Sequence, residues 1–203
     1  MIIGVDFDNT IVCYDGLFHK VALEQGLIHG DLPVSKGAVR DHLRGADQEK
    51  AWTEIQGYVY GARMGEANPY PGVCEFFKRC RQERQRVMII SHKTRFPYLG
   101  ERYDLHASAL EWLTSQGFFG PEIGLAREDV CFELGKEQKL ERISRTGCTH
   151  FVDDLPEFLA EAGFPRSVQR ILFDPSLTAA AGGWIRVDSW KEIGILLFGG
   201  ERA

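Results

Sequence analysis

Two carboxylates near the start of the chain are the first residues whose spacing suggests chemistry. The segment DFDNT places Asp6 and Asp8 one residue apart, directly after the apolar run MIIGV. A polar turn is one interpretation, because Asp and Asn suit turns and Thr can cap. The pair also carries like charges that repel, so a bound cation is the other interpretation.

Further polar residues stand at the ends of later apolar runs. Ser91 ends RVMIIS, Asp153 lies in THFVDD, and Asp174 ends RILFD. Open parallel sheets bind their ligands outside the carboxyl ends of the strands, where neighbouring strand ends lie within side-chain reach. We therefore expect Asp6, Asp8 and Asp153 to converge.

A convergent set of carboxylates predicts a hard metal ion. Mg²⁺ prefers oxygen ligands and keeps positions open for water or phosphate oxygens, so such a site would receive a phosphate group. The five cysteines are scattered without a Cys-x-x-Cys pair, and the six histidines show no metal-binding spacing. A zinc site is therefore not expected.

The elements that must position these residues alternate along most of the chain. Five short apolar runs, within residues 1–6, 86–91, 130–134, 149–154 and 170–174, read as strands. Stretches of helical spacing lie between them, such as LHASALEWLTSQG before Gly117 and LERISRTG before its closing Gly147. This alternation predicts a parallel sheet with helices on its faces.

The segment from about Tyr14 to Tyr70 interrupts the alternation. It holds helix-like stretches closed or interrupted by glycine, and no convincing strand: LFHKVALEQG, SKGAVRDHLRG and DQEKAWTEIQGYVYGARMG. The chain returns through the turn-rich NPYPG into VCEFFKRCRQERQ, an amphipathic helix. The pattern predicts a helical insertion after the first strand.

Four motifs together resemble those of a known superfamily. DFDNT matches the Asp-x-Asp-x-Thr first motif of the haloacid dehalogenase-like (HAD) phosphotransferases, and MIIS, a downstream lysine and FVDD look like the other three, in order. The resemblance implies an α/β fold, with a Rossmann-like parallel sheet (the HAD core) and a helical cap inserted after the first strand. We expect the core at 1–13 and 72–203 and the cap at 14–71.

The resemblance also implies roles for the acids. Asp6 would be the nucleophile that attacks phosphorus, and Asp8 would protonate the leaving oxygen and then activate water. Mg²⁺ would be held by the side chains of Asp6 and Asp153 and by the backbone carbonyl of Asp8. An acid at the position of Asp8 favours phosphoester chemistry over cleavage of carbon–halogen bonds.

The same resemblance implies a phosphate site. Ser91 would donate a hydrogen bond to a phosphate oxygen, helped by backbone N–H groups around His92, and a lysine would neutralise charge in the transition state. Asn9 and Thr10 complete the expected phosphate-binding set. Lys139 is the expected lysine, and Lys136, three residues earlier, is the alternative.

Two alternatives stay open for Asp154. Asp154-Leu-Pro-Glu157 reads as a capping box with Asp154 as the N-cap, whereas support of the metal site is the second possibility. We assign Asp153 to the metal and Asp174, in FDP, to a turn. His92 is expected as a backbone or loop contributor.

Two further groups could face a substrate, although ordinary packing or surface roles are favoured for both. One follows the second motif and the other lies in the insertion. The group after the second motif consists of Arg95, Tyr98 and Arg102. The group in the insertion consists of Tyr58, Tyr60 and Arg63.

Composition limits the class of partner. A formal net charge of −5 gives no long-range attraction for nucleic acid or an anionic membrane, and no apolar run approaches the roughly 20 residues of a membrane span.

We expect a cytoplasmic, magnesium-dependent phosphatase acting on a small phosphorylated metabolite. Alternatives are a 5'-nucleotidase or deoxyribonucleotidase-like activity, a phosphomutase, or a non-catalytic binding protein keeping the fold. Nothing in the sequence decides the oligomeric state.

Overall fold

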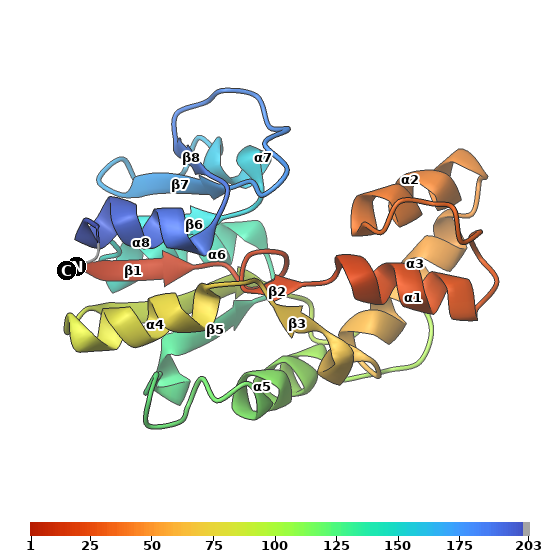
Figure 1. The fold of residues 1–203 in the computed structure, drawn as a ribbon, viewed down its shortest axis with the longest axis horizontal. Helices are drawn as coiled ribbons and strands as arrows, with labels where there is room; N and C mark the ends of the chain where they lie inside the picture. Colours follow the sequence, from red (N-terminus) through yellow and green to blue (C-terminus); the bar gives the residue numbers. More distant parts are fainter. Residues whose placement is uncertain (201–203) are drawn as a thin grey trace. The chain divides into compact units, whose positions relative to one another are not determined.

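The computed structural model describes residues 1–200 and divides the chain into two compact units (Figure 1). The core unit contains Met1–Ile11, Pro69–His92 and the chain from Gly117 onward. The helical unit contains Val12–Asn68 and Lys93–Gln116.

A six-stranded parallel sheet forms the core unit. Its strand order is β5-β4-β1-β6-β7-β8, so the first strand lies in the middle and the later strands extend to both sides (Figure 1). The Rossmann-like α/β fold predicted from the sequence is confirmed. The strands are β1 (Ile2–Val5), β4 (Arg86–His92), β5 (Val130–Glu133), β6 (His150–Asp153), β7 (Gln169–Phe173) and β8 (Ile185–Val187).

The helices of the core unit cover the sheet. They are α4 (Val73–Gln82), α6 (Lys136–Thr146), α7 (Pro156–Leu159) and α8 (Trp190–Phe198), and a 3-10 turn spans Arg127–Asp129. Gly147 ends α6 with a φ of 69°, a left-handed conformation that glycine adopts without steric cost. Neither β8 nor α8 was expected, because the three residues of β8 carry no clear alternation of their own.

Alternate side chains of β4 pack on opposite faces of the sheet. Met88 and Ile90 pack with α6 and α7 in an apolar cluster, whereas the buried Val87 and Ile89, which alternate with them, point to the opposite face. The buried members of the cluster are Met88, Ile90, Ile143, Cys148, Phe151, Phe158, Leu159, Phe164, Val168 and Leu172.

Aromatic rings hold α4 and α8 together. The ring of Trp190 lies 5.0 Å from that of Phe76 and 5.7 Å from that of Phe173 on β7, measured between centroids. Trp190 Nε1 also donates a 3.1 Å hydrogen bond to the carbonyl oxygen of Thr10, so the buried indole has a polar partner. This bond ties α8 to the loop that follows β1.

The helical unit is built from α1 (Asp15–Glu24), α2 (Lys36–Gly45), α3 (Glu49–Tyr60), a 3-10 turn (Met64–Glu66) and α5 (Leu105–Ser115). The two short strands β2 (Val12–Cys13) and β3 (Asn68–Pro69) pair with each other in a separate sheet. Within residues 1–200, no helix is both long enough and apolar enough to cross a membrane.

The helical unit takes in more of the chain than the expected insertion. Trp112 on α5 donates a 2.8 Å hydrogen bond from its indole nitrogen to the carbonyl oxygen of Ala67, and Pro97 lies against Gly57 of α3. These contacts agree with the place of 93–116 in this unit, although its sequence pattern predicted that it belongs to the core. The boundary of a cap at 14–71 remains a prediction.

Gly4, in the middle strand, offers a test of core packing. A Cβ atom at this position would lie 2.4 Å from Phe151 Cδ2 and 3.0 Å from Cys148 Sγ. We expect Gly4→Ala to lower the free energy of unfolding by about 1–3 kcal/mol, because the core cannot accept the extra volume without strain. Urea unfolding followed by circular dichroism measures the change.

Gly16→Ala is the matched control. Gly16 lies on α1, and a Cβ atom there would meet nothing within 4 Å. This variant should be neutral or gain up to about 1 kcal/mol from the helix propensity of Ala. Equal stability of the Gly4→Ala variant and the native protein would contradict the packing argument.

Candidate active site

Two adjacent strands deliver two acids to one edge of the sheet. β1 pairs with β6 so that Val5 stands beside Val152, and the N–H of Asp6 donates a 2.9 Å hydrogen bond to the carbonyl oxygen of Val152. Asp6 follows β1 directly, and Asp153 is the last residue of β6. The parallel pairing therefore brings together residues that are distant in sequence, at the carboxyl ends where such sheets bind ligands.

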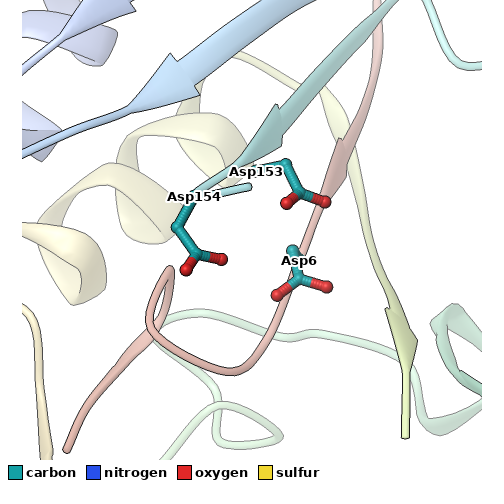
Figure 2. A group of neighbouring side chains, drawn as sticks. All are labelled: Asp6, Asp153 and Asp154. Atoms are coloured by element: carbon teal, nitrogen blue, oxygen red, sulfur yellow. The ribbon is translucent and has the colours of Figure 1, made fainter. Parts of the chain in front are cut away.

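A third carboxylate completes this group. One side-chain oxygen each of Asp6, Asp153 and Asp154 lies within 4.8 Å of the others, and Figure 2 shows the three carboxylates gathered at the ends of the strands. The side chain of Asp153 is fully buried. The arrangement offers only oxygen donors and could hold a metal ion.

Lys139 joins the first two acids. Its Nζ atom lies 2.6 Å from Asp6 Oδ1 and 2.6 Å from Asp153 Oδ2, and its side chain is only 3% exposed. Lys136 lies instead at the exposed start of α6, with its Nζ atom 3.9 Å from Glu161. Of the two lysines that the sequence left open, the structure brings Lys139 to the acids.

The charges of this group do not balance. One ammonium faces Asp6 and Asp153, and Asp154 adds another carboxylate. Burial raises the pKa of Asp6 to about 7, with Lys139 opposing the rise and Asp153 adding to it. Burial would lower the pKa of Lys139, but the neighbouring carboxylates outweigh it and hold that pKa above its usual range. The site therefore favours a further positive charge.

The loop after β1 has a fixed geometry. The N–H of Ile11 donates a 3.0 Å hydrogen bond to the carbonyl oxygen of Phe7, and Asn9 has a φ of 59°, which Asn tolerates better than most residues. Thr10 is buried, and its hydroxyl donates a 3.3 Å hydrogen bond to Asp154 Oδ1. Thr10 thus connects the first motif to the fourth.

Asp8 lies partly buried on this same loop. Among residues 1–200 the group of three close carboxylates does not include Asp8. Binding of a metal through its backbone carbonyl remains a prediction. Its position two residues after Asp6 keeps it next to the site. Its role as an acid and base remains a prediction.

Ser91 and His92 end β4, on the other side of β1. β4 pairs with β1, and Ser91 is buried while His92 is exposed. Although His92 is exposed overall, the neighbouring protein partly desolvates its ring, which lowers its pKa and favours the neutral imidazole. Both residues occupy the end of the sheet that carries the acids, as the sequence predicted, and their contact with phosphate remains a prediction.

Of the two alternatives left open for Asp154, the helix cap is not the one that the structure shows. α7 begins at Pro156, its N-cap residue is Leu155, and no side chain caps it. Asp153 instead accepts a 2.9 Å hydrogen bond from the N–H of Leu155 through Oδ1, while Asp154 is bonded by Thr10. The carboxylate that resembled a helix cap therefore belongs to the acidic group.

Asp174 has the predicted structural role. It is buried at the end of β7 and accepts hydrogen bonds from Ser176 Oγ at 3.1 Å and from the N–H of Ala179 at 2.8 Å. These bonds shape the turn that follows the strand.

Most of the other residues noted in the sequence have packing or surface roles in the helical unit. Arg63 forms ion pairs with Glu24 and Glu66, and its guanidinium carbon lies 5.8 Å from the ring centroid of Tyr58. In the loop after β4, Arg95 pairs with Asp104, Arg102 stacks over Phe96, and Tyr98 is exposed. Tyr60 differs, because it lies beside two lysines.

Replacing each lysine by methionine tests which one the acids need. Lys139→Met should lower the free energy of unfolding at pH 7 by about 3–5 kcal/mol, because it leaves two buried carboxylates without their cation. Lys136→Met, the matched control on the same helix, should change it by less than about 0.5 kcal/mol. Urea unfolding in the presence of a chelator measures both, and a larger loss for Lys136→Met would contradict the assignment.

Comparisons with known proteins agree with this fold. A HAD family hydrolase from Deinococcus radiodurans with bound phosphate and sodium has a TM-score of 0.58 at 16% identity, over 97% of this chain and 94% of that one. A predicted phosphoglycolate phosphatase from Haemophilus somnus has a TM-score of 0.53 at 16% identity, over 95% of each chain. YfnB from Bacillus subtilis, named as a HAD-hydrolase and bound to magnesium, has a TM-score of 0.50 at 14% identity, over 97% and 98%.

No family model matches the sequence, and a search of the curated proteins finds no match. At identities of 10–16%, the solved structures speak to architecture alone. The chain therefore has the fold of the haloacid dehalogenase-like (HAD) superfamily hydrolases.

Proposed function

We propose that the protein is a HAD-superfamily hydrolase that acts as a magnesium-dependent phosphatase on a small phosphomonoester. The observation that carries the proposal is the contact of Lys139 with both Asp6 and Asp153, at the ends of adjacent strands. The motif DFDNT supplies a second acid, Asp8, two residues after the first. We also propose a cytoplasmic location and a small phosphorylated metabolite as the substrate.

The similar structures support the reaction class. The protein from Deinococcus radiodurans holds phosphate, and the one from Haemophilus somnus is described as a predicted phosphatase. These structures resemble this chain in fold alone, so the argument for the proposed reaction comes from the residues at the site. Asp8 supports phosphoester hydrolysis in particular, because by the resemblance of the motifs an acid there serves to protonate an oxygen leaving group.

The donor set fits magnesium. Asp6, Asp153 and Asp154 present oxygen atoms only, and their negative charge exceeds that of the one ammonium beside them. Mg²⁺ takes a few carboxylates and leaves places for phosphate oxygens. Asp6, Asp153 and the backbone carbonyl of Asp8 would hold it, with Asp154 in support. When bound, it would offset the charge of the acids and of the substrate phosphate.

The proposed reaction proceeds in two displacements. A carboxylate oxygen of Asp6 attacks phosphorus, the bond from phosphorus to the ester oxygen breaks, and Asp8 gives its proton to that oxygen. A water molecule then attacks the aspartyl-phosphate while Asp8 takes up the proton, which releases inorganic phosphate and restores Asp6. Ser91, the backbone at His92 and Lys139 would bind the phosphate oxygens, with Asn9 and Thr10 shaping the loop beside them.

Hydrolysis of p-nitrophenyl phosphate by the full chain tests this mechanism. With Mg²⁺ present, Asp6→Asn should lower kcat by about 10⁴-fold or more, because it removes the nucleophile. Asp8→Asn should lower kcat by about 10²–10⁴-fold, because it removes the general acid and base.

Asp41→Asn is the matched control. Asp41 lies on the exposed surface of α2, where it pairs with Arg40, and its loss should change kcat by less than about twofold. Hydrolysis indifferent to both Mg²⁺ and Asp6 would rule out the mechanism. The absence of hydrolysis for any phosphomonoester would favour a binding protein that keeps the fold.

The binding of Mg²⁺ should depend on pH through Asp6. The pKa of Asp6 is about 7 without metal, and the metal requires the carboxylate, so below pH 7 a proton must leave before the metal binds. We expect affinity for Mg²⁺ to fall about tenfold or more from pH 7.5 to pH 5.5, measured by calorimetry.

The variant Asp6→Asn serves as the control for this titration. It lacks the titrating group, so its residual affinity should vary much less over the same range. Wild-type affinity that stays constant from pH 7.5 to pH 5.5 would show that Asp6 does not exchange a proton for the metal.

A further inference from the structure

A tryptophan near the end of the chain is bonded to the loop that carries the first motif. Trp190 Nε1 donates its hydrogen bond to the carbonyl oxygen of Thr10, and the hydroxyl of Thr10 donates to Asp154 Oδ1. We propose that Trp190 is a positioning residue of the candidate active site: it fixes Thr10, and Thr10 in turn holds Asp154 among the acids. This role rests on the proposed function, in which the acids bind Mg²⁺.

The local sequence sets the place of Trp190 in α8. In the segment DSWKE, Ser189 is the N-cap residue, and its side-chain oxygen accepts a 3.3 Å hydrogen bond from the N–H of Glu192. The carboxylate of Glu192 reaches back and accepts a 3.0 Å hydrogen bond from the N–H of Asp188. This reciprocal capping fixes the start of the helix at Trp190.

Aromatic neighbours orient the indole. Trp190 is only 1% exposed, and besides Phe76 and Phe173 its ring contacts that of Phe77, at 6.4 Å between centroids. Gly72 has a φ of 85°, and a Cβ atom there would lie 3.3 Å from the Cβ of Trp190, so only a small residue lets the chain pass this close. Close packing on several sides leaves the indole little freedom and keeps its N–H directed at the loop after β1.

The loop after β1 is held from outside at two successive residues. The carbonyl oxygen of Thr10 accepts from Trp190, and that of Ile11 accepts a 2.8 Å hydrogen bond from the N–H of Tyr70. Asn9 has a left-handed conformation, which is strained in residues other than glycine and persists where surrounding contacts hold it. The bond from Tyr70 comes from the backbone, whereas the bond from Trp190 comes from a side chain and can be removed by substitution.

The loop reaches the acids through one hydroxyl. Thr10 is fully buried, so its carbonyl oxygen and its hydroxyl both need protein partners. Figure 2 shows the carboxylate of Asp154 beside the loop after β1, where Thr10 Oγ1 lies 3.3 Å from Oδ1. Removing a group that orients a metal ligand typically weakens metal binding by about 10–100-fold. Trp190 is one hydrogen bond further from the acids and would act along the same path.

Amide hydrogen exchange of the metal-free full chain tests the hold of Trp190 on the loop. The N–H of Ile11, which is bonded to the carbonyl oxygen of Phe7, reports how often the loop opens. Trp190→Phe keeps an aromatic ring without the indole N–H, and we expect the Ile11 amide to exchange about tenfold faster by NMR. Benzothienylalanine incorporated at position 190, which keeps the bicyclic shape and removes only the N–H, should have the same effect.

Trp112→Phe is the matched control. Trp112 is also 1% exposed, and its indole N–H also donates to a backbone carbonyl oxygen, that of Ala67 in the helical unit. This variant loses the same kind of bond and the same side-chain volume, but it should leave the exchange of the Ile11 amide within about twofold of the native rate. Circular dichroism verifies that each variant is folded.

Binding of Mg²⁺, measured by calorimetry, tests the path from Trp190 to Asp154. We expect Thr10→Val, which removes the hydroxyl, to weaken binding about tenfold or more, and Trp190→Phe to weaken it about three- to tenfold. If Trp190 acts through Thr10, adding Trp190→Phe to Thr10→Val should weaken binding by less than about twofold further. Trp112→Phe should leave the affinity unchanged, with or without Thr10→Val.

The two measurements separate the positioning role from the proposed function. Faster exchange together with weaker, non-additive binding of Mg²⁺ supports both. Faster exchange in a chain that binds no Mg²⁺ and hydrolyses no phosphomonoester supports the hold of Trp190 on Thr10 and contradicts the proposed phosphatase. The positioning role is excluded if both substitutions at position 190 leave the exchange rate unchanged, if the native affinity for Mg²⁺ survives them, or if the two losses of affinity add in full.

Discussion

The contact of Lys139 with Asp6 and Asp153 is the interaction on which the site depends. All three side chains are buried, and taking such charges out of water costs several kcal/mol for each ion unless they are paired. The pairing requires β1 beside β6 and requires α6 to present Lys139 toward the ends of both strands. A change that shifted one strand along the other would separate the charges, so the parallel register and the chemistry depend on each other.

The sequence was sufficient for the parts of the molecule that depend on local pattern. Short apolar runs that end in Asp6, Ser91 and Asp153 predicted both the strands and the edge at which their polar residues meet, because a parallel sheet aligns its carboxyl ends. The choice between Lys136 and Lys139 required the structure. Three residues apart on one helix, the two lysines differ in direction by about 60°, and only packing decides that one is buried beside Phe158 while the other reaches the surface.

The sequence was insufficient where a side chain or helix could pair with more than one part of the chain. Asp154 satisfied the pattern of a helix cap, but the hydroxyl of Thr10, 144 residues away in sequence, binds its carboxylate instead. The helix α5 showed a clear apolar periodicity, yet periodicity identifies a buried face without identifying what covers it. The hydrogen bond from the indole of Trp112 to the carbonyl oxygen of Ala67 joins α5 to the rest of the helical unit. The sequence pattern around neither residue predicts this bond.

In the core unit, three carboxylates lie around one buried ammonium, and the raised pKa of Asp6 reflects first its burial and then the nearby charge of Asp153. Proteins retain such costly arrangements where a ligand completes them, because binding then recovers part of what burial cost. By this reasoning a bound cation would complete the group of acids.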